Sequence, residues 1–448
     1  MTTEATGPTT HPADGDNGWA DFEYGPWEEV VLPRHAPSEA LREELDLPRG
    51  IRPIDDDTVT QQPVFDPALA GYARALRPSE PAFADPEVAA RWLTARREAL
   101  NTVLSAVARS AWAEHLVLRG SILLRGWYGE AAREPGDLDF VVVPTDWELE
   151  DDRTERMIHE IAAAADRLSA DHPSADHPSA DHPSATAADT GLRLHADQAV
   201  ADEIWTYSRV PGRRLVLPWT APGVPGGTVQ LDFVFTEHLP LAPRSGELPG
   251  VSAPLLTATP ELSLAWKILW LLTDNHPQGK DLYDAVLLAQ DTQVSYELLH
   301  DVFAGSAEGG HHWPVLPSGI SDLEVDWDEF RKDYPTLAEP WEEYPSRLLT
   351  ALTPAFGGRT EYELRAAWLA PFVEELRPLL ATDGMAAVRS RIAERYLGLP
   401  DRLVVTRELL SCDFAEAVRV AAGDSDADWR VQRLREAADR FAAESDTP

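Results

Sequence analysis

The seven residues from Asp137 to Val143 (DLDFVVV) constrain the fold more than any other part of this sequence. The run is dense in β-branched and aromatic residues, which is typical of a buried β-strand. Because side chains alternate between the faces of a strand, Asp137 and Asp139 point the same way and Leu138 points the opposite way. Two carboxylates this close repel each other unless a cation such as Mg²⁺ lies between them. The run therefore predicts a strand that begins at a cation site. The alternative is two solvent-exposed aspartates that follow the turn at residues 134–136.

Gly120 and Ser121 form a second candidate binding element. They stand between a predicted strand at residues 115–119 and a predicted helix at residues 122–128. Glycine permits close approach of the backbone to a phosphate, and the first amides of a helix offer it free donors. The serine hydroxyl can add a hydrogen bond or cap the helix. Read alone, the pair is equally consistent with a simple helix-capping turn.

Asp232 is a third candidate carboxylate, within the predicted strand Thr228 to Phe235 (TVQLDFVF). A lone aspartate among apolar neighbours needs a partner. If this strand lies beside the first one, Asp232 completes a set of three carboxylates, which is suited to holding two metal ions. The alternative partner is an arginine, either Arg209 or Arg214.

Two lysines and two acids form a fourth element. Lys267 is surrounded by large apolar residues in a predicted helix, so its ammonium group must reach water or an anion. Further along, Lys280 is followed by Asp281 and Asp284, which share one face of a helix at i, i+3 spacing. Either lysine is a candidate for binding a triphosphate.

The order of elements predicts a small mixed α/β domain followed by a helical one. Residues 1–84 form an acidic, proline-rich N-terminal extension, and Asp85 and Pro86 start a long helix. Residues 85–255 carry the strands, with a low-complexity insertion at 170–190, and residues 256–448 are mainly helical. The insertion holds three copies of Ala-Asp-His-Pro-Ser. Its prolines favour a flexible surface segment over a metal site.

Composition limits the partners and the location. The chain has 76 acidic and 39 basic residues, a formal charge of −37, which repels polyanions. Cys412 is the only cysteine, so no internal disulfide forms. The first residues do not resemble a secretory signal, and the longest apolar stretch, 262–272, is too short to span a bilayer. We therefore expect a cytoplasmic protein that has no membrane partner.

Taken together and in this order, the elements resemble the AbiEii/AbiGii-type nucleotidyltransferases, the toxins of bacterial abortive-infection and toxin–antitoxin systems. The resemblance covers roughly residues 90 to 290. The matching stretches are LRGSILLR at 118–125, PGDLDF at 135–140, SLAWK at 263–267 and KDLYD at 280–284. The resemblance implies an α+β fold, with a small mixed-sheet nucleotidyltransferase domain followed by a helical domain. It also implies a nucleoside triphosphate substrate and an antitoxin partner.

The resemblance also assigns roles to residues. The metal positions, for two Mg²⁺ ions, are Asp137 and Asp139, and the strand argument adds Asp232 to them. The remaining catalytic positions are Lys267, Asp281 and Asp284. The residues expected at the nucleoside triphosphate are Gly120, Ser121, Arg125, Lys267 and Lys280.

The sequence departs from the family at Arg119, which replaces a usual glycine, narrows the loop and adds a positive charge. The acceptor of the nucleotide stays open between RNA and a small molecule. An antibiotic such as an aminoglycoside is one alternative, because acidic pockets suit cationic substrates. A catalytically inactive binding module is another. Convergence of the three carboxylates within metal-ligand distance would favour an enzyme.

Overall fold

The computed structural model describes residues 17–20, 30–171, 191–206, 210–306, 314–337, 340–423 and 428–445. The chain divides into two compact units. The first comprises Met1–Leu288 and Glu324–Trp341, and the second comprises Ala289–Leu323 and Glu342–Pro448. Most of the histidine-containing repeats (172–184) lie outside the described residues. The predicted boundaries after residues 84 and 255 stay predictions.

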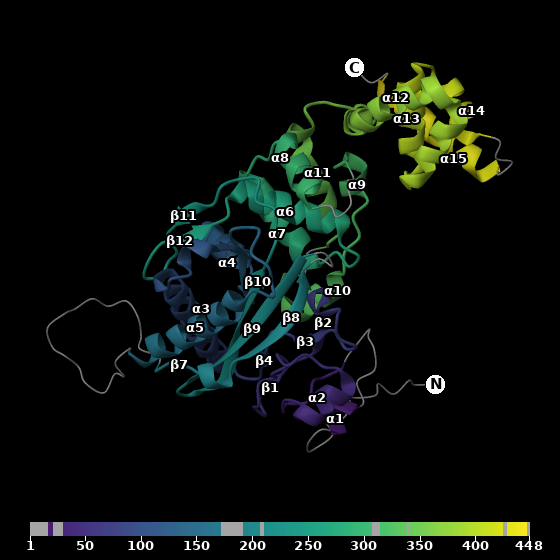
Figure 1. Ribbon diagram of the computed structural model, residues 1–448. Coiled ribbons are helices and arrows are strands. Elements are labelled where there is room, and N and C mark those ends of the chain that lie inside the picture. The colour runs from purple at the N-terminus through teal and green to yellow at the C-terminus, as the bar shows by residue number, and fades with distance from the viewer. Residues whose placement is uncertain are drawn as a thin grey trace, which may run out of the picture. The chain divides into compact units, whose positions relative to one another are not determined.

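The first unit contains a mixed β-sheet, which has eight strands in the described part of the chain (Figure 1). The strand order is β11–β12–β5–β6–β10–β9–β7, and β8 also pairs with β9. The pairs β6–β10 and β5–β12 are parallel, and the other pairs are antiparallel. The strands are β5 (Leu116–Arg119), β6 (Leu138–Val142), β7 (Arg193–Leu194), β8 (Val200–Thr206), β9 (Val210–Ala221), β10 (Val224–Val234), β11 (Arg244–Gly246) and β12 (Leu255–Thr257).

The two strands predicted to carry carboxylates are neighbours in this sheet. Strand β6 covers most of DLDFVVV, and β10 covers most of TVQLDFVF. Phe140 and Phe233 are register partners, and their rings stack with centroids 5.7 Å apart. Both side chains are fully buried, so the apolar residues of the two strands fix the register that also aligns their acids.

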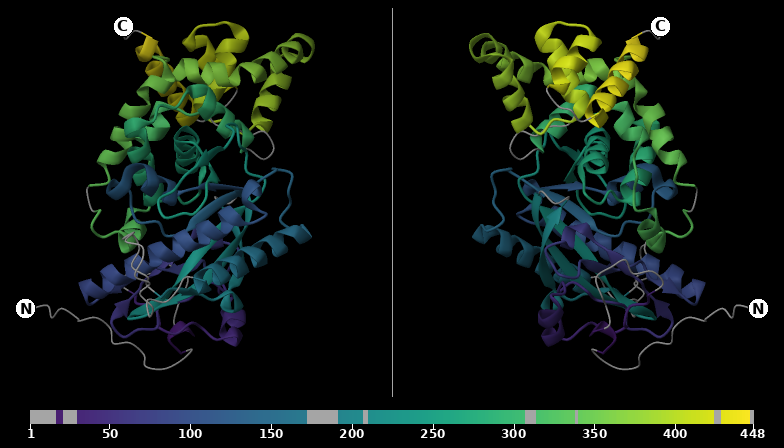
Figure 2. Two further views of the ribbon diagram at one scale, coloured as in Figure 1. Left: turned by 90° about the vertical axis from the view of Figure 1, so that its left-hand side faces the viewer. Right: turned by 90° about the vertical axis from the view of Figure 1, so that its right-hand side faces the viewer.

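Helices α3 (Pro86–Arg109) and α5 (Asp152–Ala170) contact each other, and α3 also contacts β10. Figure 2 shows these two blue helices beside the teal strands. The side chain of Asp85 caps α3 by accepting a hydrogen bond from the amide of Glu87, as the sequence predicted. The buried stripe of α3 includes Trp92, Leu100, Val103, Leu104 and Val107.

The N-terminal extension is built of short elements from residue 30 onward. These are α2 (Glu39–Leu45), β1 (Val59–Thr60), β2 (Pro63–Phe65), the 3₁₀ helix η1 (Pro67–Leu69), β3 (Leu76–Pro78) and β4 (Ala82–Phe83), after a short α1 (Asn17–Ala20). Strands β1 and β4 pair with each other, as do β2 and β3. Residues 30–83, here called the N-terminal segment, have a small core that includes Leu32, Leu41, Ile51 and Leu76. Asp202 of β8 anchors this segment by accepting hydrogen bonds from the amides of Arg49 and Gly50.

Further helices complete the first unit. The predicted helix around Lys267 corresponds to α6 (Pro260–Thr273), and the one that carries Asp281 and Asp284 corresponds to α7 (Gly279–Asp291). The remaining ones are α4 (Ser121–Tyr128), α10 (Trp327–Asp333) and the short 3₁₀ helices η2 (Ala113–His115), η3 (Gly129–Ala131) and η4 (Ala196–Gln198).

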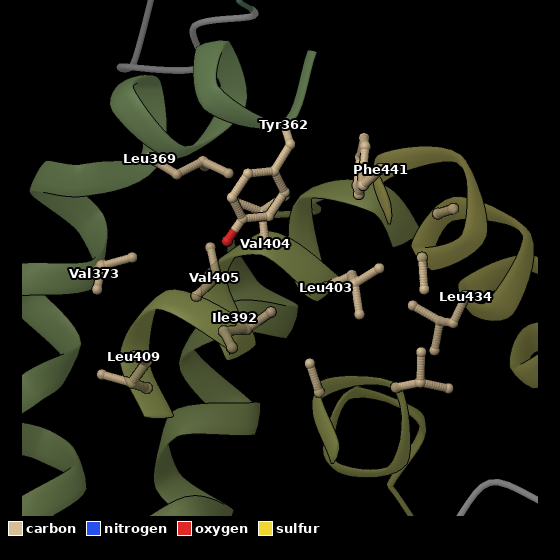
Figure 3. Close-up of a cluster of buried hydrophobic side chains, with 14 of the residues drawn as sticks. Tyr362, Leu369, Val373, Ile392, Leu403, Val404, Val405, Leu409, Leu434 and Phe441 are labelled. Carbon is tan, nitrogen blue, oxygen red and sulfur yellow. The ribbon is translucent and has the colours of Figure 1, made fainter. Parts of the chain in front are cut away.

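The second unit is helical throughout its described residues. Its helices are α8 (Tyr296–Gly305), α9 (Pro317–Ser321), α11 (Glu343–Phe356), α12 (Glu361–Glu394), α13 (Leu399–Leu410), α14 (Phe414–Ala422) and α15 (Asp428–Ser445). Figure 3 shows the core that α12 to α15 share, which includes the fully buried Leu403, Leu434 and Phe441. Gly384, at φ +74°, interrupts α12, which lies in the region predicted to be mainly helical. In the described chain, no helix combines the length and the apolar character needed to cross a membrane. The mixed α/β class is confirmed.

Candidate active site

Three aspartates converge at one edge of strands β6 and β10. Asp139 and Asp232 are register partners on the two parallel strands, and Asp137 directly precedes β6. One carboxylate oxygen from each lies within 4.8 Å of the other two. Oxygen atoms in this arrangement are the ligands that Mg²⁺ takes in proteins. The pairing of strands thus brings together the three acids that the sequence singled out.

The three carboxylates perturb one another. Burial raises the pKa of Asp139 to about 7, and the nearby charge of Asp137 adds to the effect. Burial also raises the pKa of Asp232, against the opposing effect of Arg214. For Asp137 burial acts in the same direction, but Lys280 and Arg133 outweigh it and lower the pKa. The negative charges of the three carboxylates repel one another, and a bound cation would relieve this repulsion. The three carboxylates therefore fit a divalent metal ion.

Gly120 lies directly against Asp139 of this cluster, and Ser121 follows it as the first residue of α4. Gly120 lies between β5 and α4, with φ +83°. A Cβ at this position would lie 2.3 Å from the Oδ2 of Asp139, so only glycine lets the loop approach the carboxylate. The Oγ of Ser121 is buried and has no hydrogen-bond partner in the described structure. A buried hydroxyl without a hydrogen-bond partner destabilises the folded protein by about 1–3 kcal/mol. The position of Ser121 therefore fits a binding site in which a ligand supplies the missing hydrogen bond.

Lys267 belongs to a buried network of charges. Its Nζ lies 2.6 Å from the Oδ1 of Asp281 and 3.1 Å from the Oδ2 of Asp284. Arg133 donates two hydrogen bonds to Asp284, at 3.1 and 2.9 Å, and one to the hydroxyl of Tyr334. Asp281 and Asp284 therefore form ion pairs with the ammonium group of Lys267. A triphosphate would have to compete with these two carboxylates for the ammonium group.

Lys280 lies in a different environment. It is half-buried and makes no ion pair within the described chain, and its charge acts on Asp137. It lines a cavity of about 130 Å³ together with Asp137, Arg133 and Tyr334. Of the two candidate lysines, Lys280 is the one whose ammonium group is available to an anion.

Two other arginines that the sequence singled out have protein partners. Arg119 is buried, 3.0 Å from Glu237, and its guanidinium lies over the rings of Trp266 and Trp270, at 5.1 and 5.0 Å. Its positive charge, expected to add to the phosphate loop, is thus paired with Glu237. The guanidinium of Arg125 donates hydrogen bonds to backbone carbonyls at residues 129 and 132. Arg125 does not line the cavity at Asp137.

Asp232 joins the carboxylate cluster and also pairs with Arg214, so both alternatives given for its partner are present, and its role as a metal ligand stays a prediction. Both contacts of this bidentate pair measure 2.9 Å. Arg209, the other expected partner, lies outside the described residues.

The N-terminal segment forms a wall of the cavity, which sequence reasoning missed. Half of the lining residues come from Pro48–Pro81. Asp66, Arg77 and Glu80 are among them, and each is paired with a residue from another part of the first unit. These residues share no motif and no period in the sequence. The only signal that could have identified them is that they are charged residues in a proline-rich stretch.

The fold and this site define a nucleotidyltransferase-type domain. Gly120 and Ser121 start a helix after one strand, and three aspartates gather on the two strands beside it. The family described as "Nucleotidyl transferase AbiEii toxin, Type IV TA system" matches residues 102–357, which is more than half of the chain. The chain therefore belongs to the AbiEii family, which confirms the resemblance and indicates a transferase. A search of curated proteins finds no match.

Proposed function

We propose that this protein is a Mg²⁺-dependent nucleotidyltransferase that moves a nucleoside monophosphate from a nucleoside triphosphate to an acceptor. The observation that carries the proposal is the convergence of Asp137, Asp139 and Asp232 within 4.8 Å, beside the unpartnered hydroxyl of Ser121. A cluster of repelling carboxylates next to an unsatisfied donor suits a metal-bound triphosphate better than it suits an inactive binding module.

In this proposal the three aspartates would hold two Mg²⁺ ions, which would supply positive charge to the triphosphate and to the acceptor hydroxyl. The acceptor oxygen forms a bond to the α-phosphorus. The bond from that phosphorus to the bridging oxygen breaks, and pyrophosphate leaves. In this proposal Asp232 also takes the proton of the acceptor hydroxyl.

The other residues bind and position the substrate. The Oγ of Ser121 and the first amides of α4 donate hydrogen bonds to phosphate oxygens, and Gly120 admits them to the carboxylates. Lys280 supplies a positive charge from the cavity. The buried ion pairs of Lys267 with Asp281 and Asp284 join α6 to α7, the helix that carries Lys280.

The family consists of toxins of type IV toxin–antitoxin systems. We propose that this chain acts as such a toxin in the cytoplasm, on RNA, and that it has an antitoxin partner. Two observations favour a small-molecule acceptor as a second candidate. The charge of −37 repels RNA, and the N-terminal segment walls the cavity on one side.

The test is transfer of label. The full chain is incubated with each α-labelled nucleoside triphosphate, Mg²⁺, and separate cell fractions of RNA, protein and metabolites. We expect one fraction to gain label. The Asp137→Ala/Asp139→Ala variant should transfer nothing, and Glu203→Gln, which alters a surface pair in the same unit, should behave as the wild type.

The fraction that gains label decides between an RNA and a small-molecule acceptor. Label transfer by the double variant would refute the assigned site. Failure of the wild type to label any fraction, with Mg²⁺ or with Mn²⁺, would contradict the enzyme and favour a binding module.

A further inference from the structure

Arg214 links the carboxylate cluster to the N-terminal segment. This buried arginine of β9 donates its Nε and one Nη to the two oxygens of Asp232, both at 2.9 Å. Its other Nη donates to the Oδ2 of Asp66 at 2.6 Å. Asp66 lies in the N-terminal segment, outside residues 102–357 that match the family. One guanidinium is therefore shared between a cluster acid and an acid from another part of the chain.

Asp66 is held in place independently of Arg214. Its Oδ1 accepts a hydrogen bond from the amide of Ala68, which caps the 3₁₀ helix η1, and its own amide donates to the carbonyl of Ala75. The opposing charges nearby, Arg214 first among them, outweigh burial and lower the pKa of Asp66 to about 2. It is thus a fixed negative charge, and it draws Arg214 from the side opposite Asp232.

The shared arginine bears on metal binding. A cation that binds the cluster has to share the oxygens of Asp232 with a guanidinium that contacts both of them. A buried guanidinium needs a carboxylate partner, and without Asp66 it would have Asp232 alone. With Asp66 present, Arg214 keeps a full ion pair even when Asp232 turns an oxygen to a metal.

We propose that Asp66 is a positioning residue of the metal site. It holds the guanidinium of Arg214 from one side, so that Asp232 can turn an oxygen to a metal ion without leaving Arg214 unpaired. Through this contact the N-terminal segment is part of the catalytic unit. The inference rests on the proposed metal site.

The test measures metal binding without nucleotide. The full chain is titrated with Mn²⁺, and free Mn²⁺ is measured by electron paramagnetic resonance. We expect Asp66→Asn to raise the Mn²⁺ dissociation constant by roughly fivefold or more, and Arg214→Gln to leave it unchanged or lower it. In the Arg214→Gln background, Asp66→Asn should change it by less than about twofold. Asp46→Asn removes an exposed carboxylate of the same segment and serves as the matched control.

Each outcome decides the inference. An unchanged dissociation constant in Asp66→Asn, or an equal loss in the Arg214→Gln background, would overturn it. If Asp66→Asn does not fold, Asp66→Ser replaces it, because the serine keeps the cap on Ala68. If the wild type binds no Mn²⁺, the proposed metal site and this inference fail together. The expected binding pattern without nucleotide transfer would contradict the proposed function alone.

Discussion

Asp139 and Asp232 are Cα partners in register on parallel strands β6 and β10. Equivalent positions on adjacent strands point to the same face of a sheet, so the backbone ladder itself sets the spacing of the two carboxylates. Their apolar neighbours in the ladder are fully buried and hold the register. The cation site is therefore preorganised by the sheet, at the cost of charge repulsion between the acids.

Gly120→Ala should abolish most of the nucleotide transfer. The new Cβ would lie 2.3 Å from the Oδ2 of Asp139, so this carboxylate must move away. Displacing a group of the catalytic site lowers the reaction rate roughly 100-fold. The positive φ adds about 1–3 kcal/mol of strain. Transfer rate and free energy of unfolding are measured in parallel.

Gly129→Ala is the matched control for this prediction. Gly129 also has a positive φ, but no described atom lies within 4 Å of a Cβ built there. It should lose a similar amount of stability and keep its activity. Equal loss of transfer in both variants would show that backbone strain, and not contact with Asp139, is the cause.

Asp284→Asn should destabilise the first unit by about 3–5 kcal/mol, measured by urea unfolding. Asp284 is fully buried, and its loss leaves Arg133 without a carboxylate and Lys267 with one carboxylate in place of two. Glu203→Gln breaks the more exposed pair with Arg213 and should cost under about 1 kcal/mol. Similar losses in the two variants would mean that the buried network contributes no more than a surface pair.

Lowering the pH should reduce the free energy of unfolding, partly because Asp333 becomes protonated. Burial opposes ionisation of this group, but Arg77 and the amide of Glu80 outweigh it and lower its pKa. Because the folded pKa is below the unfolded one, the stabilisation is present above about pH 4 and is lost as pH falls towards the folded pKa. The free energy of unfolding of Asp333→Asn should therefore fall less steeply than that of the wild type between about pH 5 and pH 3. Parallel curves from urea titrations would contradict this.

Mg²⁺ should raise the melting temperature of the first unit. A ligand at about 100 times its dissociation constant contributes about 2.7 kcal/mol, or roughly 5 °C for a unit of this size. Asp139→Asn should remove this response. Without Mg²⁺ the variant should be no less stable than the wild type, because one of the repelling carboxylates is gone. A Mg²⁺-dependent rise that persists in Asp139→Asn would place the ion elsewhere; differential scanning calorimetry gives both values.

Local patterns were sufficient to predict the elements that carry the site. The β-branched run after Asp139, the cap at Asp85 and the helix around Lys267 each depend on residues close in sequence, and each element is found. Strands β8 and β9 were missed, as were helices α13 and α14 of the second unit. The position of the N-terminal segment was missed as well, because its short strands are stabilised by contacts with distant residues.

The sequence by itself determined the order of the elements, the face shared by Asp137 and Asp139, and the resemblance to the AbiEii family. Only the tertiary structure decided which charges are already paired. In the folded chain Lys267 pairs with two acids, and Arg119 pairs with Glu237. Asp66 pairs with Arg214, the arginine that also contacts Asp232. The physical reason is that alternation along a strand is local, whereas a buried ion pair depends on two segments meeting in space.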